Sequence, residues 1–218
     1  MSSTQVLTST ELAAQGSEAG GCATVQEIIN ILATAEAFAV TVLGSALENA
    51  SNGSLALNAE HRQAITAARA EEQAHYAFLT ASGAKPLTTT FTLPDLQFTT
   101  DVPAFLKGLI VLEELFIAAY LAAAQEFSIL GEVEWVQHAL AIGSVEAHHR
   151  VAARFYAVEA GLIAGPPNDV AFQKAKFKNV RAAAAELKRL GFIGGGGAQM
   201  SYPGPGSIDN TSVKHLKP

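Results

Sequence analysis

The stretch Ser144-Val-Glu-Ala-His-His-Arg150 places Glu146 and His149 three residues apart, among alanines and large apolar residues that favour helix. Residues three apart on an α-helix project from the same face, about one turn from each other. The spacing therefore predicts a carboxylate and an imidazole side by side, which is a metal-chelating edge. An earlier stretch, Glu71-Glu-Gln-Ala-His75, repeats the spacing with Glu72 and His75.

Composition limits the class of protein. At 218 residues and 49% hydrophobic content, the chain can bury a full core, and only 16% of its residues are charged. The net charge is −6, and the absence of a Lys/Arg cluster before the tail argues against a nucleic-acid partner. The single cysteine, Cys22, excludes an internal disulfide and a cysteine-based metal site.

The N-terminus lacks the charged start and apolar run of a signal peptide. No later segment offers about twenty apolar residues free of charge, the length that a membrane-spanning helix requires. We therefore expect a soluble cytoplasmic protein with no membrane partner.

Apolar residues at helical spacing predict four long helices, at about residues 24–50, 58–82, 102–127 and 132–161. Asn58 is suited to cap the second helix, and Pro103 to the first turn of the third. Gly143 allows close approach of another backbone one turn before Glu146. A shorter, lysine-rich fifth helix is predicted from about Val170 to Leu190.

The connection between the second and third helices, residues 83–103, is long and holds three prolines. Bundle connections usually take about two to eight residues. A helix of about 24 residues is about 36 Å long, and about twenty extended residues reach about 60 Å. The connection can therefore return along the bundle, so that the second and third helices run parallel.

Three regions follow from this pattern. Residues 1–23 are rich in Ser, Thr, Gly and Gln and are expected to form a mobile arm. Residues 24–161 are expected to form the bundle. Residues 162–218 are expected to hold the fifth helix and a Gly/Pro-rich irregular tail, which either wraps the bundle or stays mobile.

The first and third helices each carry a glutamate on an apolar face. Glu36 interrupts the face of the first helix, and Glu113 or Glu114 that of the third. We prefer Glu113, because four large apolar residues lie three, four or seven positions from it: Leu106, Ile110, Ile117 and Tyr120. Glu114 would then face outward or bind a neighbour. Each half of the chain is thus a helical hairpin with a lone Glu followed by Glu-x-x-His.

This pattern resembles the ferritin-like superfamily of di-iron and di-manganese carboxylate bundles. It resembles in particular the ferritin-like group that includes desiccation-related proteins, through Ala-Glu-Ala-Phe, Leu-Glu-Glu-Leu-Phe-Ile-Ala-Ala-Tyr, Val-Glu-Ala-His-His and the Gly-Phe-Ile-Gly-Gly…Tyr-Pro-Gly-Pro ending. The resemblance implies an all-α, ferritin-like four-helix bundle with a dinuclear metal site. Its ligands would be Glu36, Glu72 and His75 for one metal and Glu113, Glu146 and His149 for the other, with Glu72 and Glu146 bridging.

Charge supports a metal site independently. Four buried carboxylates without partners would each cost several kcal/mol, and no Lys or Arg is expected at an inward position. Two divalent cations would neutralise them. Oxygen and imidazole donors without thiolate suit Fe or Mn, and zinc stays open as an alternative.

The leading function hypothesis is redox chemistry with O₂ or peroxide, as metal oxidation or as protection against oxidative stress. The alternative is a non-catalytic protein of stress or desiccation, structural or metal-binding. A storage cage is disfavoured by the long tail, and a homodimer is an assembly that the sequence allows. An organic substrate is not indicated.

Other candidate residues have plainer interpretations. Each Glu-x-x-His pair, and Glu36, could instead lie on a wet surface, and Glu71 competes with Glu72 at the wrong spacing. His148 is expected beside the site or in solvent. The tyrosines Tyr76, Tyr120 and Tyr156 are expected in or around the core, and the histidines His61, His138 and His215 on the surface.

Overall fold

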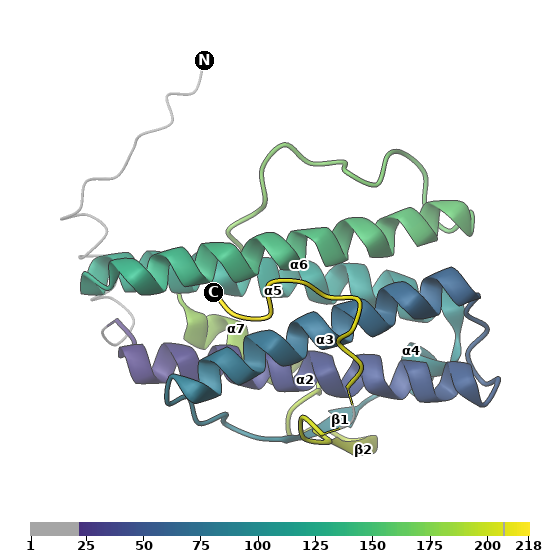
Figure 1. The fold of residues 1–218 in the computed structure, drawn as a ribbon, viewed down its shortest axis with the longest axis horizontal. Coiled ribbons are helices and arrows are strands. Elements are labelled where there is room, and N and C mark those ends of the chain that lie inside the picture. The colour runs from purple at the N-terminus through teal and green to yellow at the C-terminus, as the bar shows by residue number, and fades with distance from the viewer. Residues whose placement is uncertain (1–21, 207) are drawn as a thin grey trace.

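Four long helices form the body of the protein, in a computed structural model that describes residues 22–206 and 208–218 (Figure 1). Helices α2 (Val25–Ser51) and α3 (Ala59–Ala81) form one antiparallel hairpin, and α5 (Val102–Leu130) and α6 (Val133–Glu159) form the second. The ribbon shows α3 and α5 running in the same direction, as the length of the connection predicted. The all-α, ferritin-like bundle with a long crossover is confirmed.

The helix boundaries follow local capping chemistry. Thr24 and Glu27 form a capping box at the start of α2. The Asn58 side chain accepts a hydrogen bond from the backbone N–H of His61 at the start of α3, as predicted. Asp101 caps α5, whose first turn holds Pro103.

The crossover contains two short elements, strand β1 (Thr90–Leu93) and helix α4 (Gln97–Thr100). Strand β2 (Ala198–Ser201) pairs with β1 in antiparallel register, Thr90 opposite Ser201 and Leu93 opposite Ala198. The tail therefore packs on the crossover. The sequence left open whether the tail wraps the bundle or stays mobile, and this strand pairing favours wrapping. From there it runs across α3 to the C-terminus (Figure 1).

The fifth helix is shorter than the sequence predicted. Helix α7 covers only Val180–Arg189, and its N-cap Asn179 accepts a hydrogen bond from the backbone N–H of Ala182. The predicted first half, residues 170–179, is irregular and leaves Phe172 90% exposed. Apolar and lysine residues nearly alternate there, so no apolar stripe at helical spacing could pack on the bundle.

Helix α2 is long and apolar enough to cross a membrane, with a mean hydropathy of 1.7 over its best 18-residue window. In this fold, however, 83% of that window is buried within the bundle. Its side chains, including Ile28, Leu32 and Phe38, lie in the core. The apolar sequence of α2 is thus accounted for by its central position.

The N-terminal arm lies mostly outside the described residues, which begin at Cys22. The two described arm residues are held against α5: the Ala23 N–H donates a 3.0 Å hydrogen bond to the buried Glu126 carboxylate, and the Cys22 thiol lies 3.7 Å from it. The other oxygen of Glu126 accepts from the backbone N–H of Val180 at the start of α7. Glu126 therefore joins three segments of the chain.

Candidate metal centre

The bundle brings six polar side chains from four helices into its interior. Each of the four glutamates exposes 2% or less of its surface, and the two histidine side chains expose 6% and 11%. The six are Glu36 of α2, Glu72 and His75 of α3, Glu113 of α5, and Glu146 and His149 of α6. All six residues singled out in the sequence therefore meet in one place, although their role as metal ligands stays a prediction.

Ligand atoms fall into two overlapping groups, within each of which all lie within 4.8 Å of one another. One group comprises Glu36, Glu72, His75 and Glu146, and the other Glu72, Glu113, Glu146 and His149. Glu72 and Glu146 belong to both groups, and each histidine belongs to one. This is the arrangement expected of two cations that share two carboxylates.

Both imidazoles turn their Nδ1 atoms toward carboxylate oxygens. His75 Nδ1 lies 3.4 Å from Glu36 and 3.3 Å from Glu146. His149 Nδ1 lies 3.1 Å from Glu72 and 3.3 Å from Glu146. An imidazole nitrogen carries at most one proton, so it cannot donate to all the oxygens around it.

The cluster holds every buried side-chain atom of the described residues that lacks a hydrogen-bond partner. These eight atoms are Glu36 Oε2, both oxygens of Glu72, His75 Nδ1, Glu113 Oε2, both oxygens of Glu146 and His149 Nδ1. Buried polar atoms are normally paired, because an unpaired one costs about 1–3 kcal/mol and more when charged. Eight converging oxygen and nitrogen donors fit a pair of cations.

Burial and mutual repulsion set the protonation of the cluster without metal. Burial, with the charge of Glu72, raises the pKa of Glu36 to about 8. Burial, with the charges of Glu146 and Glu72, raises the pKa of Glu113 well above its usual value despite the opposing effect of His149. Glu36 therefore holds a proton at neutral pH, and burial disfavours ionisation of Glu113 in the same way.

The pKa values of the histidines and of the shared carboxylates shift so that the charged forms are favoured. Burial alone would lower the pKa of His75 and His149, but the carboxylates around them raise both well above the usual value. Burial would also raise the pKa of Glu72 and Glu146, but the two histidines lower it. The histidines and these two carboxylates thus stabilise one another's charged forms.

Glu71, which the sequence assigned only as a competitor of Glu72, supports His149 from outside the cluster. Its Oε2 lies 2.7 Å from His149 Nε2, and this contact lowers the pKa of Glu71. The interaction orients the ring so that Nδ1 faces Glu72 and Glu146. The only sequence signal was the adjacency of Glu71 to Glu72, which does not specify a partner on another helix.

Tyr120 supports Glu36 in a similar way. The Tyr120 hydroxyl is buried and donates a hydrogen bond to Glu36 Oε1. Gly143 permits this packing, because a Cβ atom there would lie only 3.1 Å from Tyr120 Cβ. The close helix approach predicted at Gly143 is confirmed, and Tyr120 lies in the core beside the cluster.

The choice between Glu113 and Glu114 has a clear geometric outcome. Glu113 lies in the cluster, whereas Glu114 accepts hydrogen bonds from Arg150 and Lys176. Arg150 is buried as well, at 3% exposed. Its guanidinium binds Glu114 and Asp169, so it anchors the irregular segment rather than neutralising the cluster.

Two cavities reach the cluster. One, of about 220 Å³, touches Glu113 and His149 and has mostly apolar walls. The other, of about 410 Å³, touches His75 and is covered by residues 213–218 of the tail. The cluster is therefore approached by one space on the His149 side and by another on the His75 side.

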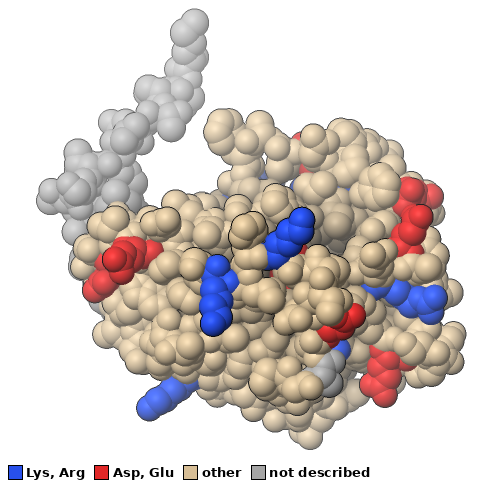
Figure 2. Space-filling view, in the orientation of Figure 1, with Lys and Arg blue, Asp and Glu red and all other residues tan. Residues whose placement is uncertain are grey.

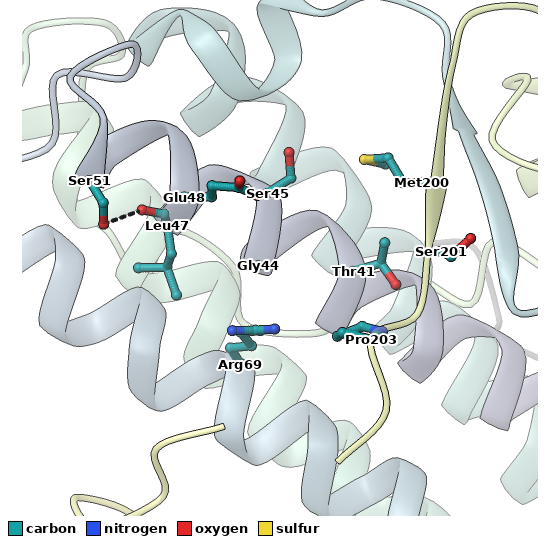
Figure 3. Close-up of a pocket in the computed structure, with 10 residues that line it drawn as sticks. All are labelled: Thr41, Gly44, Ser45, Leu47, Glu48, Ser51, Arg69, Met200, Ser201 and Pro203. Carbon is teal, nitrogen blue, oxygen red and sulfur yellow. Dashed lines mark hydrogen bonds between the residues drawn. The ribbon is translucent and has the colours of Figure 1, made fainter. Parts of the chain in front are cut away.

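A larger hollow, of about 510 Å³, lies away from the cluster, between α2 and the tail (Figure 3). Arg69 crosses from α3 beside Gly44, where a Cβ atom would lie 2.9 Å from its guanidinium, and donates to the carbonyl oxygen of Val40. None of the six cluster residues lines this hollow. It is therefore separate from the candidate metal centre.

The remaining histidines occupy different settings. His148 is exposed and lines both cavities that reach the cluster, as expected for a residue beside the site. His61 packs on Tyr156, with ring centroids 4.1 Å apart, and His138 packs on Phe78. These two are half-buried, so they pack on the surface of the bundle instead of extending into solvent. His215 is exposed.

Residues 24–159 match the family model of the ferritin-like domain. No curated protein and no solved structure gives a significant match to the chain. The matched region spans all four long helices and contains all six residues of the cluster. The chain therefore belongs to the ferritin-like domain family.

Proposed function

We propose that this protein holds two metal ions in the six-residue cluster and uses them for redox chemistry with O₂ or peroxide. The observation that carries the proposal is the set of eight buried, unpartnered donor atoms, all of them within the cluster among the described residues. Four carboxylates contribute −4 and two divalent cations +4, so the loaded centre would be neutral. The same arithmetic explains why these carboxylates tolerate burial.

The donor set favours iron or manganese. Carboxylate oxygens and imidazole nitrogens, without thiolate, suit both metals, and zinc remains a competitor because it binds such donors tightly. We propose that Glu36 and His75 hold one ion, that Glu113 and His149 hold the other, and that Glu72 and Glu146 bridge them. Redox-active ions bound there would supply the electrons that reduce the oxidant.

The residues around the cluster would keep the centre ordered and dry. Glu71 would hold the His149 ring in one orientation, and the Tyr120 hydroxyl would hold one oxygen of Glu36. Large apolar side chains of α2 and α5, such as Leu32 and Phe116, are buried in the surrounding core. Such walls limit bulk water and strengthen electrostatic interactions with bound ions.

Metal analysis followed by rapid mixing tests the proposal. Protein prepared without chelator should hold two Fe or Mn ions per chain, and reduced protein mixed with O₂ or H₂O₂ should show a fast absorbance change. The change should be lost in Glu146→Gln and retained in Glu114→Gln, a matched substitution at a glutamate that binds Arg150 instead. A loaded protein that is inert to both oxidants, but melts at lower temperature after chelation, would support a non-catalytic, structural role instead.

We also propose, from the soluble character of ferritin-like domains, that the protein works in the cytoplasm. The face shown in Figure 2 carries scattered acidic and basic side chains among its described residues.

A homodimer remains a prediction, which a measurement of the mass of the protein in solution can test.

A further inference from the structure

We infer that the cavity beside Glu113 and His149 binds a small, uncharged, apolar molecule, in the size range of one or two aromatic rings. The cavity occupies about 220 Å³, and all four long helices contribute to its walls. The cavity is partly open to solvent, because the exposed His148 lines it, and it extends inward to the buried Glu113 and His149. Packed helices leave few spaces larger than a water molecule between them. A space of this size next to the cluster is therefore a feature to be explained.

Small side chains create the space. Ala64, Ala67 and Ala68 line it from α3, and Ala152 and Ala153 line it from α6. Alanine side chains end at Cβ, so they do not interdigitate across the gap between these helices. Four larger residues, Leu43, Ile65, Leu106 and Leu109, complete the apolar wall.

The walls of this cavity disfavour a charged ligand. Five polar residues line the cavity. Glu113 and His149 direct ligand atoms toward the other cluster residues, and Glu71 binds His149. The other two are His148, which is exposed, and Tyr156, whose ring packs on His61. A charged ligand would lose its hydration on transfer among these methyl groups without gaining a partner for its charge. An uncharged hydrocarbon group loses nothing comparable and gains from leaving water.

The volume sets the size of the ligand. A dry apolar cavity of about 150 Å³ is large enough to bind benzene. The cavity here is somewhat larger and accommodates one ring with substituents, two fused rings, or an alkyl chain of similar volume. Its location places such a molecule against the Glu113 and His149 half of the cluster, not the half near Glu36.

This inference deepens the proposed function, on which it rests for its chemical meaning, because it identifies the class of molecule held beside the metal ions. The cavity is defined by apolar residues, however, so binding can be measured with or without metal. Naphthalene is a suitable probe, since it is uncharged, fluorescent and of matching size. Naphthalene-2-carboxylate has a similar ring system and carries a charge.

Naphthalene should bind the full chain saturably, with one site per chain, while naphthalene-2-carboxylate binds at least tenfold more weakly. Ala68→Leu fills the cavity from α3 and should weaken naphthalene binding at least tenfold. Ala77→Leu is the matched control, because it makes the same change at an exposed position of the same helix. Ala152→Leu fills the cavity from the opposite wall and replaces Ala68→Leu if thermal melting shows that the latter does not fold.

Two results would overturn the inference: no saturable naphthalene binding to the wild-type chain, or binding that both filled variants retain. The outcome is separable from that of the proposed function. Protein with two reactive metal ions and no naphthalene site would refute only the cavity assignment. Protein that binds naphthalene but holds no metal would refute only the redox proposal.

Discussion

The Nε2 atom of His149 lies 2.7 Å from the Oε2 atom of Glu71, a residue outside the six-residue cluster. Glu71→Gln should therefore weaken binding at the metal position that His149 serves by about 10–100-fold, the range typical for loss of a carboxylate that orients a metal-bound histidine. Competition with a chelator of known affinity measures the effect. The control is Glu60→Gln, at an exposed position of α3. Gln73→Glu is not suitable as a control, because the Gln73 side chain accepts a hydrogen bond from Tyr202. Equal affinity in Glu71→Gln and wild type would show that packing alone orients the ring.

Metal binding should release protons. Glu36, with a pKa of about 8, holds a proton at pH 7, and the pKa values of Glu113, His75 and His149 are raised as well, so bound cations would compete with protons. Since binding releases protons, metal affinity should rise with pH, and the dependence should weaken above about pH 8, where Glu36 ionises without metal. Calorimetry in buffers of different ionisation enthalpy counts the protons. Metal binding without proton release at pH 7 would contradict this account of the cluster.

The Glu36→Gln substitution should stabilise the metal-free protein at high pH and lower its metal content. The folded-state pKa of Glu36, about 8, exceeds its ordinary value of 4.5, so the folded state holds this proton more tightly than the unfolded chain. Stability of the metal-free protein should therefore fall as the pH rises between those values. Glutamine resembles the protonated carboxyl and does not titrate.

The metal-free Glu36→Gln variant should thus melt a few degrees above wild type at pH 9, since about 1 kcal/mol corresponds to about 2–4 °C for a chain of this size. At pH 5 the two melting temperatures should converge. The same variant should hold fewer than two metal ions, whereas Glu114→Gln should hold two. A melting-temperature difference that does not change with pH would show that Glu36 does not titrate in this range.

The tail should slow access to the cluster. Residues 213–218 cover the cavity that reaches His75, together with Phe78 and His138. Deleting these six residues should accelerate metal loading several-fold, measured by stopped-flow mixing of the metal-free protein with Fe²⁺ or Mn²⁺, and leave the final metal content unchanged. Thr211→Ala, in the exposed turn before the deleted segment, is the control. Unchanged loading rates would place the route elsewhere, with the cavity beside Glu113 as the next candidate.

Most of the fold could be predicted because its signals are local. Helical spacing, the Asn58 cap and the prolines of the crossover each act within a few residues, and the structure agrees with all three. The prediction of the fifth helix was wrong in its first half, and the reason is local as well. Residues 170–179 have helical composition without an apolar stripe, and Arg150 binds Asp169 just before them. Propensity alone does not hold a short helix in water.

The sequence by itself determined the four helices, their connectivity and the six residues of the cluster, because a helix with period 3.6 places Glu and His three apart on one face wherever it occurs. Only the tertiary structure decided that Glu71 supports His149, that Arg150 is buried against Glu114, and that facing alanines leave a cavity beside Glu113. These relationships join different helices. They depend on how each helix is rotated and shifted against its neighbour, and packing of the whole core sets that.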